Sequence, residues 1–443
     1  MAPFINHHER NGFTFTRKND DLPYKRDRYS YFTHHCHPPA SELTTPVTAD
    51  HEDVHAGIGI LPFFEGKNIF NLLLVQLDSL EKIINSELFG RVKEKYGKCF
   101  VREKMIPIVG DICEPNLGMD NESIDIIRKN VDVIIHSATN TTFNERYDVI
   151  FDTNVIAPQR LMRFAKTCNK LQLFTHVSTA FVNEGEGIIL EKPLMMGDNA
   201  EGVDVADEIS LLLKSSTINL NSDYDATKFL KNLGQQRAEL YGSSTTYQLM
   251  AISYGKGLLP AYFANPQVPL DLITVDLVAN TMIAAIAKHG NTLTPQLNVY
   301  HVASSLSNPL TLSDAFEYLY EHFNAAPLIE HSNIAKVKFF DNFEQFSKYT
   351  RECNRAVSED TEVIRQCNAK VEYAQQLCKI YEFAGFFKAR FHTGNTQKLL
   401  EEMSKEEQLN FEMNVRNINW KTYIRDIHVP GLRKYVINTA RAT

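Results

Sequence analysis

Short apolar segments alternate with amphipathic segments along the first half of the chain. The apolar runs, which indicate strands, lie at 69–75, 106–109, 131–136 and 171–177. The amphipathic stretches, which indicate helices, lie at about 78–96, 121–129 and 153–168. This alternation is typical of a parallel sheet covered by helices. The sequence therefore predicts an α/β fold with a Rossmann-like, doubly wound sheet.

Three regions are expected along the chain. Residues 1–56 show no sustained helical or strand period and are rich in His, Asp, Thr and Pro, which predicts a flexible leader. Residues 57–310 carry the α/β pattern, and residues 311–443 are rich in predicted helix and indicate a smaller C-terminal domain. With 443 residues, 43% of them apolar, the chain is long enough to bury a full core.

Charge, cysteine content and hydropathy exclude several classes of protein. The chain has 46 basic and 54 acidic residues and no basic stripe, so we expect no nucleic-acid partner. Its seven cysteines contain no CxxC pair, which favours reduced thiols in an intracellular protein. No apolar run reaches the length of a transmembrane helix, while peripheral membrane contact stays open.

One cluster in the leader consists of residue types that bind metal ions. His34, His35, Cys36 and His37 are contiguous rather than at ligand spacing, and no second cluster completes a tetrahedral site. We therefore expect no metal.

The candidate functional residues follow the predicted strands, because ligands of an open parallel sheet bind outside the carboxyl ends of its strands. Asp111 can accept a hydrogen bond from an adenine amino group, although a Gly-Asp pair is also an ordinary turn. Ser137 and Ala138 are small enough for a bound cofactor to approach the backbone. The hydroxyl of Thr179 can hydrogen-bond a carbonyl that is being reduced.

Several longer segments carry a specific resemblance. The segments GIGILPFFEGKNIF, IPIVGDICEPNLG, VDVIIHSATNTTFNERYDV, HVSTAFVNEGEG and LGQQRAELYG resemble, in order and spacing, the extended short-chain dehydrogenase domain of plant fatty acyl reductases of the male-sterility type. Later segments, among them FFKARFHTGNTQKLLEEMS and INWKTYIRDIHVPGLRKYV, are similar to the C-terminal part of the same family. The resemblance covers most of residues 57–436.

The resemblance implies a chemistry and a set of roles. Such enzymes use NADPH to reduce a long-chain acyl thioester, on coenzyme A or acyl carrier protein, to a primary alcohol through an aldehyde. Residues 57–310 would be the NAD(P)-binding reductase domain and 311–443 the C-terminal domain of the family. Asp111, Ser137 and Ala138 would line the cofactor, and Thr179 would belong to the catalytic group. The GIGI stretch resembles plastid members, with cytoplasm or endoplasmic reticulum as alternatives; the oligomeric state stays open.

The sequence departs from the family pattern after its first strand. A dinucleotide domain places a glycine-rich turn there, so that backbone N–H groups hold the pyrophosphate. Here GKNIF runs directly into NLLLVQLDSLEKIINSELF, without the TG-x-x-G-F turn. A crossover shortened in this way would leave too few residues for a parallel connection, which needs about a dozen.

A second departure removes the usual Tyr and Lys, in which the ammonium lowers the pKa of the phenol that protonates the substrate. Gly242 runs into SSTTYQLMAISYGKG, and Tyr247 has Ala251 rather than Lys four residues on. Tyr224 and Lys228 are the Tyr-x-x-x-Lys candidate of this chain, on a helix started by Ser222 or Asp223. Chance alone can supply one such pair among 18 tyrosines, so a surface helix is the alternative.

Aromatic and polar clusters in the C-terminal region favour structural roles. Phe339, Phe340, Phe343 and Phe346 have nearly helical spacing and predict a core face rather than an acyl groove. Residues 395–397 predict the start of a solvated helix, and Trp420 and Tyr423 are expected to anchor the tail.

Two further hypotheses compete with an active reductase. The first is a catalytically inactive, truncated or mispredicted member of the family with poor solubility, because both departures remove interior elements. The second is an extended short-chain dehydrogenase that acts on sugar nucleotides, which would share the fold but not the C-terminal segments.

Overall fold

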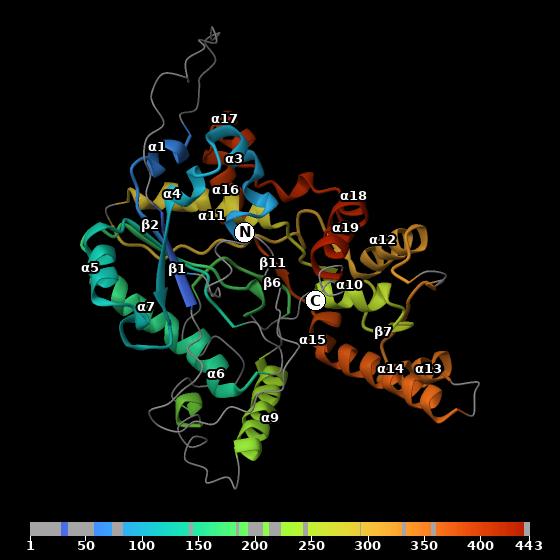
Figure 1. The fold of residues 1–443 in the computed structure, drawn as a ribbon. Coiled ribbons are helices and arrows are strands. Elements are labelled where there is room, and N and C mark those ends of the chain that lie inside the picture. The colour runs from blue at the N-terminus through green and yellow to red at the C-terminus, as the bar shows by residue number, and fades with distance from the viewer. Residues whose placement is uncertain are drawn as a thin grey trace, which may run out of the picture.

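A mixed sheet lies at the centre of the molecule, with helices on both sides and a helical body beside it (Figure 1). The computed structural model describes residues 28–33, 57–72, 83–140, 145–182, 186–193, 207–211, 223–241, 247–292, 294–329, 334–355 and 360–437. The strands of the sheet are β1 (Arg28–Thr33), β2 (Ile69–Leu72), β3 (Met105–Gly110), β4 (Val133–His136) and β5 (Leu173–His176). Their order across the sheet is β3-β1-β2-β4-β5.

Four of these strands confirm the sequence prediction, and the fifth does not. Strands β2, β4 and β5 pair in parallel, as the apolar runs predicted. The expectation that the leader holds no strand is wrong for β1, which lies between β2 and β3 and runs antiparallel to both. Phe32 pairs with Phe70 on one side and with Ile106 on the other. The sheet is therefore mixed, because an antiparallel strand from the leader lies where a parallel neighbour of β2 was expected.

The connection from β2 to β3 contains several short helices. These two strands run in the same direction, since β1 is antiparallel to each. Residues 73–104 join them, which is long enough for a parallel crossover. The described part of this connection contains η1 (Glu87–Phe89), α3 (Gly90–Tyr96) and α4 (Phe100–Lys104).

One face of the sheet is covered by α5 (Asn121–Asn130) and α7 (Ala157–Ala165). Helix α5 begins where Asp120 accepts a hydrogen bond from the backbone N–H of Ser123, as an N-cap aspartate should. Ile127 and Leu161 from the two helices pack with Ile134 of β4, and all three are fully buried.

The opposite face is covered by α1 (Ile60–Phe64), α11 (Val275–Gly290) and α16 (Gly394–Glu402) (Figure 1). Val133 and Ile135 of β4 point to this face, because side chains alternate along a strand. A Cβ at Gly290 would lie 2.2 Å from the ring of Phe63, so α1 approaches α11 as closely as only glycine permits. Helices thus cover both faces, and the predicted α/β, doubly wound, Rossmann-like fold is confirmed.

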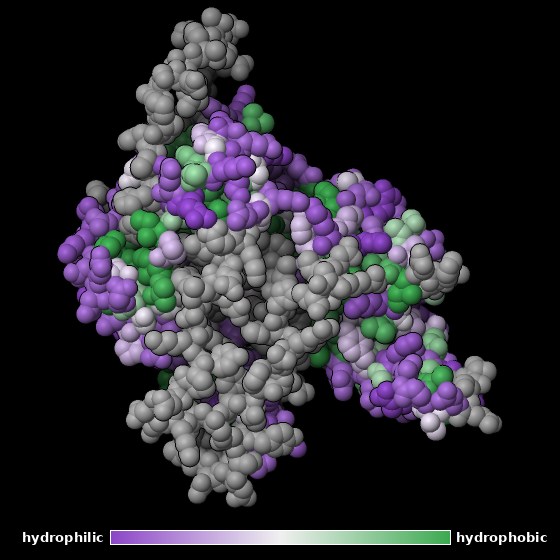
Figure 2. Space-filling view, in the orientation of Figure 1, coloured by the Kyte–Doolittle hydropathy of each residue, from purple (hydrophilic) through white to green (hydrophobic). Residues whose placement is uncertain are grey.

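The helical body beside the sheet has its own core. It is built from α10 (Tyr247–Gly255), β7 (Ala261–Phe263), α12 (Leu312–Ala325), β10 (Lys338–Phe340), α13 (Phe343–Cys353), α14 (Thr361–Ile380), α18 (Trp420–Thr422), η6 (Tyr423–His428) and α19 (Val429–Leu432). Phe346 is fully buried there, and Phe339, Phe340 and Phe343 pack around the same core, so the predicted core face is confirmed. The outer surface of α13 and α14 is mostly hydrophilic (Figure 2).

The tail is anchored by Trp420, whose indole N–H donates to the carbonyl of Asn308 at 2.9 Å. The core of the helical body includes α10 and β7, which precede residue 310, while α16 follows it and packs on the sheet. Elements from both sides of residue 310 thus pack together. The division into 1–56, 57–310 and 311–443 stays a prediction.

The remaining elements are short or peripheral. They are η2 (Pro115–Gly118), α6 (Tyr147–Phe151), η3 (Asp152–Ile156), η4 (Ala180–Val182), β6 (Ile188–Ile189), α9 (Asp223–Tyr241), β8 (Pro269–Leu270), β9 (Leu310–Thr311), α15 (Glu382–Gly385), β11 (Arg390–Phe391), α17 (Lys405–Asn410), η5 (Val415–Asn417) and η7 (Arg433–Ile437).

Within the described ranges, no helix is both long and apolar enough to cross a bilayer, and no group of three or more His, Cys, Asp or Glu side chains could hold a metal. The cluster at 34–37 lies outside those ranges.

Deleting β1 tests its place inside the sheet. A chain that starts at His34 would leave the facing edges of β2 and β3 without hydrogen-bond partners, whereas a chain that starts at Arg28 keeps them. We expect the shorter protein to melt at a lower temperature and to aggregate, and the longer one to behave as the full chain. Equal melting curves for the two truncated proteins would show that β1 does not support the sheet.

Candidate active site

Asp111 lies directly after β3 in a tight turn. Its backbone N–H donates to the carbonyl of Leu117 at 2.7 Å, and its Oδ1 accepts from the backbone N–H of Cys113 at 2.9 Å. Asn116 and Leu117 have positive φ angles of 51° and 60°, which brings the chain back toward Gly110. A Cβ at Gly110 would lie 2.6 Å from the Leu117 carbonyl oxygen. Asp111 is thus held at the edge of the sheet by a turn that the Gly-Asp pair makes possible.

The segment after β4 is held by a residue that the sequence analysis missed. Ala138 is buried and Ser137 is half-buried. Asn154, in the π-helical turn η3, accepts from the hydroxyl of Thr139 at 2.9 Å and from the backbone N–H of Asn140 at 2.8 Å. Its own amide donates to the Asn140 carbonyl at 2.9 Å. π-Helical turns are frequent at functional sites, but this one has no signal in the sequence.

Two histidines pair across the ends of β4 and β5. His136 and His176 are neighbours in the ladder, their rings stack with centroids 4.7 Å apart, and their Nδ1 atoms are 2.7 Å apart. His136 is 1% exposed. Burial, with a smaller contribution from His176, lowers the pKa of His136 to about 4, and burial also lowers the pKa of His176. One ring donates and the other accepts, so the contact requires that at least one ring stay neutral.

Thr179 lies on the exposed loop after β5. Its Oγ1 accepts from the backbone N–H of Phe181 at 3.3 Å and so starts the short helix η4. A hydroxyl that accepts in this way can still donate its hydrogen to a substrate oxygen. The strand ends thus bring Asp111, Ser137, Ala138 and Thr179 to one edge of the sheet, as the sequence predicted for an open parallel sheet.

Tyr224 and Lys228 lie on α9, which begins at Asp223 as predicted. Leu233 on the buried side of this helix packs with residues of α6, and a Cβ at Gly234 would lie 2.9 Å from the Glu145 carbonyl. Lys228 is exposed, and no hydrogen bond joins it to Thr179 in the described part of the chain. The side chain of Tyr224 lies outside the described residues.

A buried acid near α9 was also missed. The hydroxyl of Tyr147, at the start of α6, donates to the carboxylate of Glu208, which is 7% exposed. The two residues are far apart in the sequence, which offers no periodic signal for their contact.

A nicotinamide dinucleotide does not fit this edge in the ordinary way. The sequence has no glycine between Gly66 and Gly90, so the segment after β2 lacks the turn whose backbone N–H groups hold a pyrophosphate. The ribose is normally held from the carboxyl end of a second parallel strand. Here β1 is antiparallel and places its amino end, Arg28, beside Gly110. Asp111, Ser137 and Ala138 could line the adenosine, while the pyrophosphate would need contacts other than a glycine turn.

Comparisons with known proteins identify the family. A chloroplastic fatty acyl-CoA reductase 2 of Arabidopsis thaliana is 35% identical, with 80% of this chain and 70% of the relative covered. A probable fatty acyl-CoA reductase 4 of the same plant is 30% identical, with 80% and 88% covered. The family described as male sterility protein matches in two parts, its NAD-binding part at residues 75–239 and its Sterile part at 354–439.

The chain belongs to the fatty acyl-CoA reductase family.

One further relative has a name of the same kind, and one solved structure is similar over most of its length. An alcohol-forming fatty acyl-CoA reductase of Simmondsia chinensis is 27% identical, with 81% of this chain and 88% of that protein covered. The solved terminal R domain of a myxalamid pathway superposes with a TM-score of 0.49 at 13% identity, covering 83% and 84% of the two chains. That superposition adds nothing to the fold that the sheet itself shows.

The comparisons also bear on the departures from the family pattern. The alignment with the chloroplastic relative runs over 435 positions but takes in 80% of this chain, so that fatty acyl-CoA reductase has segments without a counterpart here. The NAD-binding match begins at residue 75, just after β2.

The buried histidines predict acid sensitivity. Burial lowers the pKa of both His136 and His428 to about 4, whereas an unfolded histidine titrates near 6.5. The unfolded chain therefore binds protons first, so the stability that these residues provide is complete above pH 6.5 and is lost as the pH falls toward 4.

We expect the melting temperature to fall across that window, and to fall less in His136→Gln and in His428→Gln. Thermal melts at intervals between pH 4 and 8 would test this. If the melting temperature of a variant falls with pH as steeply as that of the parent, the corresponding histidine does not cause the acid sensitivity.

Proposed function

We propose that the protein reduces long-chain fatty acyl thioesters, on coenzyme A or acyl carrier protein, to primary alcohols with NADPH. The observation that carries the proposal is the edge of the sheet: this chain, a member of the family, has Asp111, Ser137, Ala138 and Thr179 at the ends of β3, β4 and β5. Plastid is the compartment that we propose, supported by a relative named as chloroplastic.

The chain's own residues have distinct tasks in this proposal. Thr179 donates a hydrogen bond to the thioester carbonyl oxygen and stabilises the negative charge that develops there. Asn154 fixes the segment after β4, which would keep Ser137 and Ala138 in one position beside a nucleotide once it binds. NADPH, when bound, supplies the hydrides. The missing glycine turn implies that its phosphates would need contacts other than the usual backbone cradle.

A second function is a non-catalytic member of the family that binds acyl thioesters or partner reductases. It is favoured by the lack of a glycine between Gly66 and Gly90 and by the exposed position of Lys228. A protein of this kind would keep the fold without turnover.

Binding and turnover separate the two functions. We expect the purified full chain to bind NADPH, measured by cofactor fluorescence, and to form hexadecanol from palmitoyl-CoA or palmitoyl-acyl carrier protein, measured by gas chromatography. Thioester binding without cofactor binding and without alcohol would support the non-catalytic function and overturn the reductase.

Substituting the hydroxyl tests the role of Thr179. Thr179→Val keeps the shape of the side chain but removes the donor, and loss of one oxyanion donor costs about 10²-fold in kcat or more. We expect Ser178→Ala, a change in the neighbouring hydroxyl, to stay within a few-fold of the parent.

Variants of α9 test the alternative acid pair. If α9 is a surface helix, Tyr224→Phe and Lys228→Met should leave kcat unchanged, since Lys228 is exposed. Loss of turnover in both variants, with the melting temperature preserved, would instead make this pair the proton donor.

A further inference from the structure

The loop that follows Thr179 is held by the C-terminal part of the chain. Strand β6 pairs in parallel with β11, Ile188 opposite Arg390 and Ile189 opposite Phe391. The backbone N–H of Arg390 donates to Gly187, and that of His392 donates to Ile189, both at 2.8 Å. Residues about 200 positions apart in the sequence thus form one small sheet beside the candidate site.

An aromatic cluster joins the Thr179 loop to this small sheet. The ring of Phe181 lies 5.2 Å from that of Phe387 and 5.3 Å from that of Phe391, in tilted and edge-on contacts. Phe181 is also the residue whose backbone N–H donates to the Thr179 hydroxyl. The position of this hydroxyl therefore depends on where Phe387 and Phe391 lie.

A buried carboxylate fixes that part of the chain. Glu191 follows β6, and its side chain is 2% exposed. Its Oε1 accepts from the backbone N–H of His301 at 2.8 Å, and its Oε2 accepts from that of Asn395 at 2.6 Å. The backbone N–H of Thr396 donates to Oε1 at 3.3 Å, and its hydroxyl lies 3.1 Å from Oε1 and 2.8 Å from the His301 carbonyl oxygen. These partners come from two segments far apart in the sequence, so one charged side chain joins three parts of the molecule.

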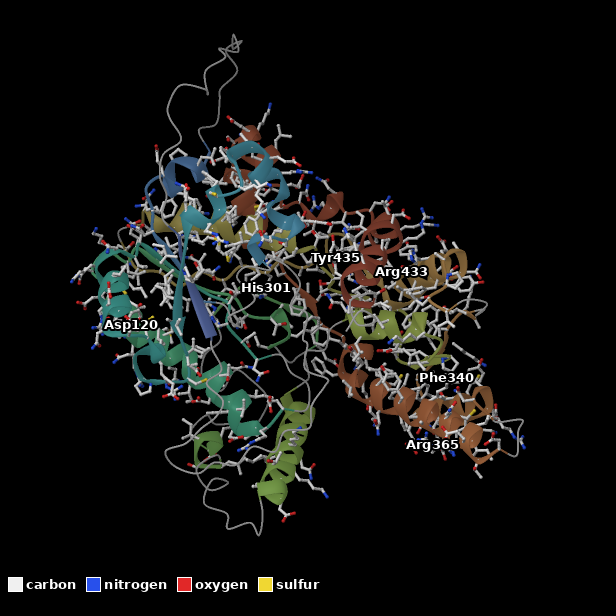
Figure 3. All side chains as sticks on the ribbon, viewed as in Figure 1. Asp120, His301, Phe340, Arg365, Arg433 and Tyr435 are labelled. Atoms are coloured by element: carbon white, nitrogen blue, oxygen red, sulfur yellow. The ribbon has the colours of Figure 1, made fainter. Side chains whose placement is uncertain are left out.

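Glu191 also suits the end of the helix that it binds. Asn395 and Thr396 belong to the first turn of α16, whose backbone N–H groups have no partners within the helix. A carboxylate there is favoured by the helix dipole and by charge-assisted hydrogen bonds. Figure 3 labels His301 near the middle of the molecule, between the sheet and the C-terminal helices. The contact is therefore internal to the fold rather than a surface ion pair.

We infer that Glu191 is a positioning residue for Thr179, and that residues 387–396 are part of the active-site scaffold. Glu191 holds the start of α16, and its Oε2 lies 3.5 Å from Nδ1 of His392, the residue that follows β11. Strand β11 contains Phe391, whose ring packs against that of Phe181 beside the hydroxyl. The catalytic part of this inference rests on the proposed reductase function. Its structural part does not.

The chain offers a matched control in the same segment. Glu186 also reaches the C-terminal part, through an ion pair with Lys388, but its side chain is 74% exposed. Exposed pairs of this kind contribute little. Glu191→Gln leaves one oxygen to accept and turns an amide N–H₂ toward backbone donors, whereas Glu186→Gln removes only the surface pair.

The test combines kinetics with amide hydrogen exchange on the full chain. In Glu191→Gln we expect faster exchange at 394–397 and also at 179–182, with kcat lowered about tenfold or more and KM for the acyl thioester nearly unchanged, because small misplacements of a reacting group are costly. In Glu186→Gln we expect neither change.

The outcomes are distinguishable from failure of the reductase proposal. If the parent forms no alcohol, that proposal fails, while exchange at 179–182 still decides whether Glu191 positions the loop. Faster exchange at 394–397 alone would overturn the inference. Should Glu191→Gln fail to fold, Phe181→Leu must show the same selective loss of kcat and loosening of 179–182, and parent behaviour in that variant would overturn it.

Discussion

The fold depends on hydrogen bonds between the backbone of β1 and its two neighbours. An unpaired strand edge inside a sheet is costly, because every buried N–H and C=O needs a partner. With β1 in place, β2 and β3 run in the same direction without touching, and β4 and β5 extend the sheet on the far side of β2. The helices then cover two continuous faces, and the ends of β3, β4 and β5 meet at one edge where the candidate residues lie.

The parts of this structure that follow from local pattern could be predicted. Apolar runs located β2 to β5 to within a few residues, the amphipathic stretch at 121–129 located α5, and the spacing of Phe343 and Phe346 identified a core face. Strand β1 could not be predicted in the same way, because six residues in a leader without a sustained period are a weak signal and their pairing partners lie far along the chain.

The candidate site also contains residues that the sequence predicted and residues that it did not. Asp111, Ser137, Ala138 and Thr179 follow strands, so topology alone brings them to one edge. Asn154 and Glu191 gave no signal, because each acts on backbone groups whose position is known only once the chain has folded. Residues 395–397 were expected to start a solvated helix, and the helix does begin there, but its first turn is buried against Glu191 rather than open to solvent.

The antiparallel strand from the leader also affects how the protein is made. Strand β1 leaves the ribosome first, yet Arg28 pairs with Gly110 and Ser30 pairs with Leu72, so it waits unpaired until both partners have been synthesised. The face of the sheet that α16 covers stays open for longer, since Leu399 is added near the end of translation. Long-range pairing of this kind slows folding and leaves apolar surface exposed meanwhile. The sheet therefore gains its last covering helix only after almost the whole chain has been synthesised.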